Sequence, residues 1–131
     1  MDRTEFETYI REAYDTEPDY PWEKQSSYAV YRHRGNRKWF AVVLDIPGAK
    51  LGLQGREQMS IVNLKCEERL MGSFLGRPGI YPAYHMNKAN WLSLALDGSA
   101  DNDDIKLLLS LSHSLTAPSP RTKRKTKAPQ Q

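Results

Sequence analysis

Two short stretches of the sequence concentrate side chains that could bind a polyanion. The first holds four basic residues and a histidine between aromatic residues: Arg32, His33, Arg34, Arg37 and Lys38, flanked by Tyr28, Tyr31 and Trp39. Arginine and lysine neutralise phosphates, and an aromatic ring can stack on an unpaired base. The stretch therefore indicates a basic β-wing. The alternative is a solvated turn whose neighbouring aromatic residues belong to the core.

The second stretch is Tyr84-His85-Met86-Asn87-Lys88. Lys88 offers a point charge to a phosphate, and Asn87 can both donate to and accept from a base edge. His85 completes this candidate nucleic-acid site. The alternative is structural, because asparagine tolerates turn geometry and a half-buried histidine can bond to backbone. A run of such specific residue types fits a buried polar network as readily as a binding surface.

Three further residues could carry chemistry but have simpler interpretations. Trp22 and Trp91 could line a pocket with His85, although tryptophan more often fixes a loop to the core, where it buries a large area. Cys66 stands at the head of a predicted helix, where the helix dipole can lower the pKa of a thiol. With no base predicted beside it, we interpret Cys66 as a small packing residue.

Catalytic patterns are poor. The chain has no GxSxG, P-loop or HExxH motif. Its three histidines, which include His113, lack metal-ligand spacing, and Glu67 and Glu68 are adjacent and cannot share one helix face. We therefore expect a protein without enzymatic activity, metal ion or cofactor.

Composition sets the class of protein. A chain of 131 residues suits one domain, and a single cysteine excludes an internal disulfide. No apolar run approaches the ~18 residues that span a bilayer, and the N-terminus lacks the apolar stretch of a signal peptide. We expect a cytoplasmic monomer that does not associate with membranes.

The net charge of +3 is unevenly distributed. Five of the 19 basic residues and no acidic residue lie between Arg121 and Lys127, which leaves 14 basic against 16 acidic residues elsewhere, a net charge of −2. DNA-binding domains are usually basic overall. A nucleic-acid site on the body must therefore be a local patch, or depend on the tail.

Hydrophobic periodicity and turn residues predict eight elements. Thr4 and Glu7 fit a capping box at the start of the first helix. The elements are a helix over Thr4–Asp15, strands over Tyr28–Arg34, Arg37–Asp45 and Met59–Lys65, a helix over Cys66–Leu75, strands over Tyr81–Met86 and Asn90–Leu96, and a last helix capped by Ser99 or Asp101 and reaching Leu115.

The order α-β-β-β-α-β-β-α, with short turns between strands, predicts an α+β fold in two layers, an antiparallel sheet with helices packed on it. Residues 1–115 form the domain. Residues 116–131 are rich in Pro, Ser, Thr and Lys without apolar periodicity, and we expect a disordered basic tail.

Several motifs resemble the signature of the bacterial MmcQ/YjbR family, in the same order along the chain. They are Tyr84-His85-Met86-Asn87-Lys88 followed by Trp91, Asp19-Tyr20-Pro21-Trp22, Lys38-Trp39-Phe40-Ala41 and Asn63-Leu64-Lys65-Cys66. The resemblance implies a YjbR-like, double-wing fold that contacts the DNA backbone without sequence preference. That fold is also similar to type III secretion chaperones, so a protein-binding adaptor is the rival function.

Overall fold

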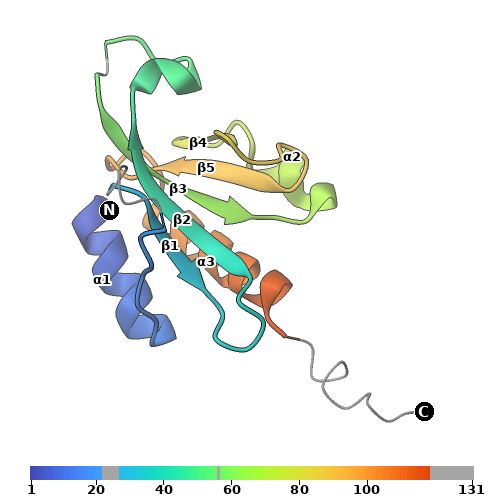
Figure 1. Ribbon diagram of the computed structural model, residues 1–131. Coiled ribbons are helices and arrows are strands. Elements are labelled where there is room, and N and C mark those ends of the chain that lie inside the picture. Colours follow the sequence, from blue (N-terminus) through green and yellow to red (C-terminus); the bar gives the residue numbers. More distant parts are fainter. Residues whose placement is uncertain (22–26, 56, 119–131) are drawn as a thin grey trace.

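The chain folds into two layers, with helices packed against one face of a five-stranded antiparallel sheet (Figure 1). The computed structural model describes residues 1–21, 27–55 and 57–118. The elements are α1 (Arg3–Tyr14), β1 (Ala29–Arg32), β2 (Trp39–Ile46), β3 (Met59–Lys65), α2 (Met71–Phe74), β4 (Ile80–Pro82), β5 (Trp91–Ala95) and α3 (Asn102–Thr116). The predicted α+β class and element order are confirmed. No helix in the described ranges is long and apolar enough to cross a membrane.

The strands lie in the order β1-β2-β3-β5-β4, and every neighbouring pair is antiparallel. Ala41, near the start of β2, pairs with Leu64 near the end of β3. Pro82, at the end of β4, pairs with Leu92 near the start of β5. Since Lys65 at the end of β3 pairs with the first residue of β5, the β1–β2 and β4–β5 connections emerge at the same end of the sheet.

We call residues 33–38 the first turn and residues 83–90 the second turn. Three inter-strand spacings separate the centres of the two hairpins, which places the turns about 14 Å apart. Lys65 ends the strand that lies between them.

The two faces of the sheet differ in what covers them. On one face, buried strand residues form the main core with side chains of α1 and α3, including Phe6, Ile10, Ile105 and Leu108. The other face, which we call the open face, carries no long helix from the described part of the chain. Its smaller cluster holds Val30, Val42, Leu44, Ile46, Met59, Ile61 and Ala95, with partly buried aromatic residues at its margin.

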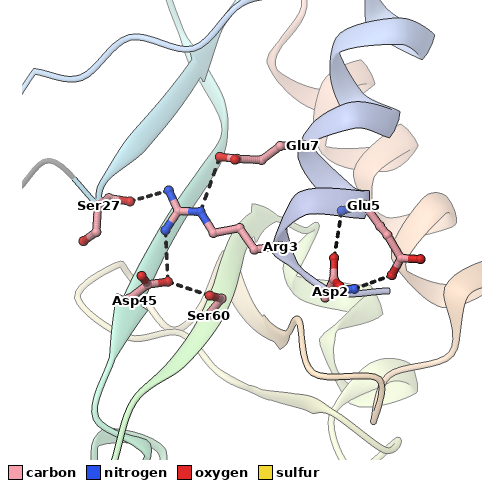
Figure 2. Close-up of polar contacts among 7 residues, drawn as sticks. All are labelled: Asp2, Arg3, Glu5, Glu7, Ser27, Asp45 and Ser60. Carbon is pink, nitrogen blue, oxygen red and sulfur yellow. Dashed lines mark hydrogen bonds and ion pairs between the residues drawn. The ribbon is translucent and has the colours of Figure 1, made fainter.

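α1 begins two residues earlier than its predicted capping box requires. Asp2 is the N-cap, its carboxylate accepts from the Glu5 N–H at 2.8 Å, and the Glu5 carboxylate accepts from the Asp2 N–H at 2.8 Å (Figure 2). The predicted Thr4–Glu7 box is therefore wrong. Asp2 and Glu5 have the same three-residue spacing as Thr4 and Glu7, so the motif alone could not distinguish them. Glu7 instead forms an ion pair with Arg3 at 3.5 Å.

Arg3 attaches the N-terminal end of α1 to the sheet (Figure 2). Its guanidinium donates to the Asp45 carboxylate of β2 at 3.0 Å and to the Ser27 carbonyl ahead of β1 at 2.5 Å. The Ser60 hydroxyl of β3 donates to the same carboxylate. The N-terminus of α1 is thus fixed at the sheet end opposite the two turns.

Several elements are shorter than the sequence predicts, including the strands expected over Tyr28–Arg34 and Asn90–Leu96, which span Ala29–Arg32 and Trp91–Ala95. The strand expected over Tyr81–Met86 ends at Pro82, because the chain then leaves the ladder and His85 adopts a left-handed conformation with φ 59°. The helix expected over Cys66–Leu75 contains a 3₁₀ turn at Glu68–Leu70 and one turn of α-helix. In contrast, α3 extends one residue past the boundary expected at Leu115, because Thr116 is helical and buried. Residues 119–131, the greater part of the predicted tail, lie outside the described residues.

Candidate nucleic-acid interface

A β-bulge shapes the strands that lead into the first turn. Tyr31 pairs with Ala41 and Arg32 pairs with Trp39, so Phe40 is the extra residue. Phe40 and Ala41 consequently both face the helices, whereas Trp39 joins the open face. The bulge thereby places the aromatic ring of Trp39 and the side chain of Arg32 next to one another.

Arg32 is held in the protein by two contacts. Its Nε donates to the Asp19 carboxylate at 2.9 Å, and its guanidinium carbon lies 5.7 Å from the centre of the Trp39 ring. Only 23% of the side chain is exposed. Asp19 is itself fixed, since its backbone exchanges two hydrogen bonds with Val30. Of the predicted phosphate contacts in this turn, Arg32 is the least accessible.

The other basic residues of the first turn are exposed, but two lie beside acidic residues. Arg37 approaches the Asp19 carboxylate at 3.8 Å, and Arg34 donates to the Asp15 carbonyl at 3.0 Å with the Asp15 carboxylate 3.9 Å away. Lys38 is exposed and forms no ion pair with any other described residue. The acidic segment between α1 and β1 therefore offsets part of the predicted positive charge, which the sequence spacing could not reveal.

The first turn is also tied to the end of α3. The His33 ring is buried and lies 2.9 Å from the Thr116 hydroxyl, while the Asn36 amide donates to the Thr116 carbonyl at 2.9 Å. The rings of His33 and His113 are 4.3 Å apart and both contact Phe40. Burial lowers the pKa of His33, and burial together with the neighbouring His33 lowers the pKa of His113. His33 is thus a structural residue of this turn.

A buried polar network holds the second turn against the open face. The Ser93 hydroxyl donates to the Asn63 side-chain oxygen, the Asn63 amide donates to the Tyr84 carbonyl at 2.9 Å, and the Tyr84 N–H donates to the Ser93 hydroxyl at 2.9 Å. Asn63 is 2% exposed and Ser93 fully buried. The structural interpretation of this motif therefore applies to Tyr84, through its backbone.

The three predicted contact residues of the second turn have different positions. Asn87 shapes the turn, because its side-chain oxygen accepts from the Ala89 N–H at 2.9 Å and its carbonyl accepts from the Asn90 N–H. His85 is exposed, with its ring 4.0 Å from the Tyr84 ring. Lys88 is exposed and has no ion pair among the described residues. His85 and Lys88 therefore remain accessible, whereas Asn87 has a turn-forming role.

A pocket of about 510 Å³ lies on the open face between the two hairpins. It is lined by Tyr28, Trp39, Val42, Leu44, Asn63, Tyr84, His85 and Met86. The predicted pocket of His85 with Trp22 and Trp91 is wrong for Trp91, which does not line this pocket, and Trp22 lies outside the described residues. Trp39 supplies the tryptophan instead, because the bulge turns it to this face. Burial and the neighbouring Tyr84 raise the pKa of Tyr28, and both tyrosines line the pocket.

Cys66 agrees with its sequence interpretation, whereas Lys65 and Ser93 are additions to it. Cys66 is buried, and burial followed by the adjacent Glu67 raises the pKa of its thiol, in agreement with a packing residue and opposite to an activated one. Lys65 and Ser93 were not predicted as part of a site. Strand pairing alone brings Lys65 between the turns and Ser93 next to Asn63; the motif that contains Lys65 gave it no binding role, and no motif marks Ser93.

The fold and the paired turns define a two-layer α+β protein of the YjbR type, and the YjbR family model matches residues 11–115. The chain belongs to that family. It is 36% identical over 116 residues to the uncharacterized protein YyaQ of Bacillus subtilis, covering 88% of this chain and 98% of YyaQ.

Solved structures agree with this assignment. The crystal structure of a Pseudomonas syringae protein that is 44% identical in sequence matches this chain with a TM-score of 0.86. The match covers 89% of this chain and 100% of that chain. A solution structure from the same organism is 43% identical in sequence and has a TM-score of 0.83. It covers 92% of this chain and 96% of that chain. A Deinococcus radiodurans protein at 19% identity shares the fold, with a TM-score of 0.61 over 89% and 83%.

Proposed function

We propose that the protein is a non-enzymatic nucleic-acid-binding protein that contacts the phosphate backbone through its two turns. The observation that supports this proposal is the register of the sheet, which brings both turns and Lys65 to one end. Lys38 and Lys88 are exposed cations of the two turns, and neither has an ion-pair partner among the described residues. At about 14 Å apart, the turns span roughly four nucleotides of a stacked strand, at about 3.4 Å each.

One form of the rival protein-binding function, pairing of a partner strand with the sheet edge, receives less support. The β4 edge is three residues long and ends in Pro82, which has no N–H to donate. At the β1 edge, Val30 already exchanges two backbone hydrogen bonds with Asp19. Short or occupied edges discourage strand addition. A protein partner would have to bind another surface.

The test must separate the body from the basic tail, because five basic residues in one segment can attract any polyanion. A full-length variant with Arg121, Lys123, Arg124, Lys125 and Lys127 changed to Gln removes the tail charge without shortening the chain. Fluorescence anisotropy with a labelled oligonucleotide at 50 and 200 mM salt then reports on the body. We expect binding at low salt that weakens steeply with added salt, since phosphate neutralisation releases counterions.

The binding residues are tested in the same tail-neutral background. Changing Lys38 and Lys88 to Gln should weaken binding about tenfold and reduce the salt slope by roughly two. Changing Arg11 and Lys106 to Gln removes two charges from α1 and α3 and serves as the matched control. Equal losses in both double variants, or no binding by the tail-neutral protein at 50 mM salt, would contradict the proposal.

A further inference from the structure

The open-face pocket has the shape and chemistry of a site for a flat aromatic group. Trp39 comes from the first hairpin and Tyr84 and His85 from the second turn, so the walls belong to both hairpins. Val42 and Leu44 give an apolar floor. A volume of about 510 Å³ falls within the range of about 300–1,000 Å³ that is typical of small-molecule pockets.

The pocket also contains hydrogen-bonding capacity beyond what the fold uses. The Asn63 amide has two N–H donors and two oxygen lone pairs, of which the network with Ser93 and Tyr84 uses one donor and one lone pair. Asn63 lines the pocket. One donor and one acceptor therefore remain to recognise the polar edge of a planar ring, beside aromatic faces that can stack on it.

Charge around the pocket favours an anionic carrier for that ring. Lys38 directly precedes Trp39 in the first turn, and Lys88 follows three residues after His85 in the second turn; both lysines are exposed. If the ring in the pocket belongs to a nucleic-acid strand, the phosphates next to it in that strand can contact these cations. Paired bases in a duplex cannot enter, because their faces are stacked and their edges are joined.

We propose that this pocket takes an unpaired nucleobase, and that the protein consequently prefers single-stranded to double-stranded nucleic acid. This inference rests on the proposed function and adds the ligand class. Trp39 and Tyr84 stack on the base, Asn63 bonds to its edge, and the two turns hold the neighbouring phosphates. Stacking of this kind tolerates any base, in keeping with backbone recognition without sequence preference.

The experiment compares oligonucleotides that differ only in their bases. Full-length protein is titrated against a labelled 12-nucleotide oligothymidylate and a 12-nucleotide abasic strand, which carry the same phosphates. We expect the oligothymidylate to bind about tenfold more tightly or better, as one stacked base provides. A duplex of the same length, which carries twice as many phosphates but no unpaired base, should bind less tightly than the oligothymidylate.

Variants assign the preference to the pocket. Trp39→Leu and Tyr84→Leu should each bring the ratio of the two affinities close to one, while abasic binding changes less than twofold. Tyr9→Leu, an aromatic change on α1 in the opposite layer, should keep the ratio. Circular dichroism and thermal midpoints verify folding, and His85→Gln, at an exposed residue of the pocket wall, should also lower the ratio and reports on the pocket if either leucine variant fails to fold.

The outcomes separate this inference from the proposed function. Equal affinity for the abasic strand and the oligothymidylate overturns the pocket site and leaves phosphate binding by the turns intact. A preference that survives in every folded pocket variant also overturns it, because the bases are then read elsewhere. Binding of no oligonucleotide at low salt overturns the proposed function and this inference together.

Discussion

The first and second turns look alike in sequence and are built differently. The first turn is fixed by side chains of distant elements, since Asn36 and His33 contact Thr116 and two of its arginines face acidic residues. The second turn is fixed through backbone groups, namely the N–H and carbonyl of Tyr84. In the second turn the side chains of His85 and Lys88 are consequently left for solvent or a ligand.

This difference shows how a basic cluster should be interpreted. The arginines of the first turn are close together in sequence, but their electrostatic partners come from the segment after α1. Lys88 stands alone in sequence and keeps its charge accessible. A residue's availability for binding therefore depends less on the density of charge around it in sequence than on which elements the fold brings opposite it.

The largest expected contrast concerns two glycines, one just ahead of β4 and one in the first turn. Gly79, just ahead of β4, has φ 76°, and a Cβ there would lie 2.6 Å from the Ala100 backbone nitrogen. Gly35 in the first turn would place a Cβ 3.0 Å from the Pro118 ring. We expect Gly79→Ala to lower the free energy of unfolding by about 3 kcal/mol or more, from overpacking and left-handed strain, and Gly35→Ala to cost about 1 kcal/mol or less.

Urea denaturation of the two variants measures this contrast. Gly98→Ala is the control for strain alone, because Gly98 has φ 90° and open space around its Cβ position. A Gly79→Ala protein as stable as Gly98→Ala would show that the contact with Ala100 does not position β4.

The next contrast compares two asparagines. Asn63→Ala removes a buried side chain and leaves the Ser93 hydroxyl and the Tyr84 carbonyl without their partner, so we expect a loss of about 2–3 kcal/mol. Asn36→Ala removes a half-exposed side chain whose partners can bond to water, and we expect about 1 kcal/mol or less. Equal losses in chemical denaturation would mean that the two turns are held equally firmly.

Sequence reasoning predicted the architecture because periodicity and turn residues report directly on local structure. The element order and the two aromatic-basic stretches are local features of this kind. The predicted boundaries were less accurate at the start of the first helix, where the capping-box motif fits both Thr4 and Asp2. They were also less accurate at Pro82, which ends a strand although apolar residues follow it in sequence.

The candidate site was predicted only in part, for a different reason. Its composition depends on strand pairing and on one bulge, which are long-range features. Trp39 could be placed on the pocket side only once Phe40 was known to be the bulged residue. In sequence, Asn63 is noted only as part of a family motif and Ser93 is an unmarked strand residue; they form a network only because β3 and β5 are neighbours.

Acid should weaken the attachment of the first turn more than that of the second. His33 and His113 have lowered pKa values in the folded protein, mainly because burial disfavours the charged rings. Below the ordinary histidine pKa of about 6.5, the unfolded chain binds protons that the folded protein does not, so stability falls as the pH drops from there toward the folded pKa values.

Urea denaturation at pH 7.5, 6.5 and 5.5 tests this effect. The fall in stability should be smaller in His113→Gln, which removes one buried ring, while His85→Gln, which removes an exposed ring from the second turn, should retain the full fall. A His113→Gln profile that matches the unmodified protein would show that the buried pair is not the source of acid sensitivity.

The smallest expected effect on stability concerns the exposed charges themselves. Arg34 is 81% exposed and its carboxylate partner Asp15 is 96% exposed, so solvent screens the pair. We expect Arg34→Ala and Lys88→Ala each to change the free energy of unfolding by about 0.5 kcal/mol or less.

The effects of the two changes on oligonucleotide binding should differ, because Asp15 already offsets part of the Arg34 charge while Lys88 faces no described acid. Anisotropy at 50 mM salt should show a several-fold loss for Lys88→Ala and less than a twofold loss for Arg34→Ala. The reverse ranking would mean that a bound strand displaces Asp15 from Arg34, and that the ion pairs of the first turn do not limit its availability.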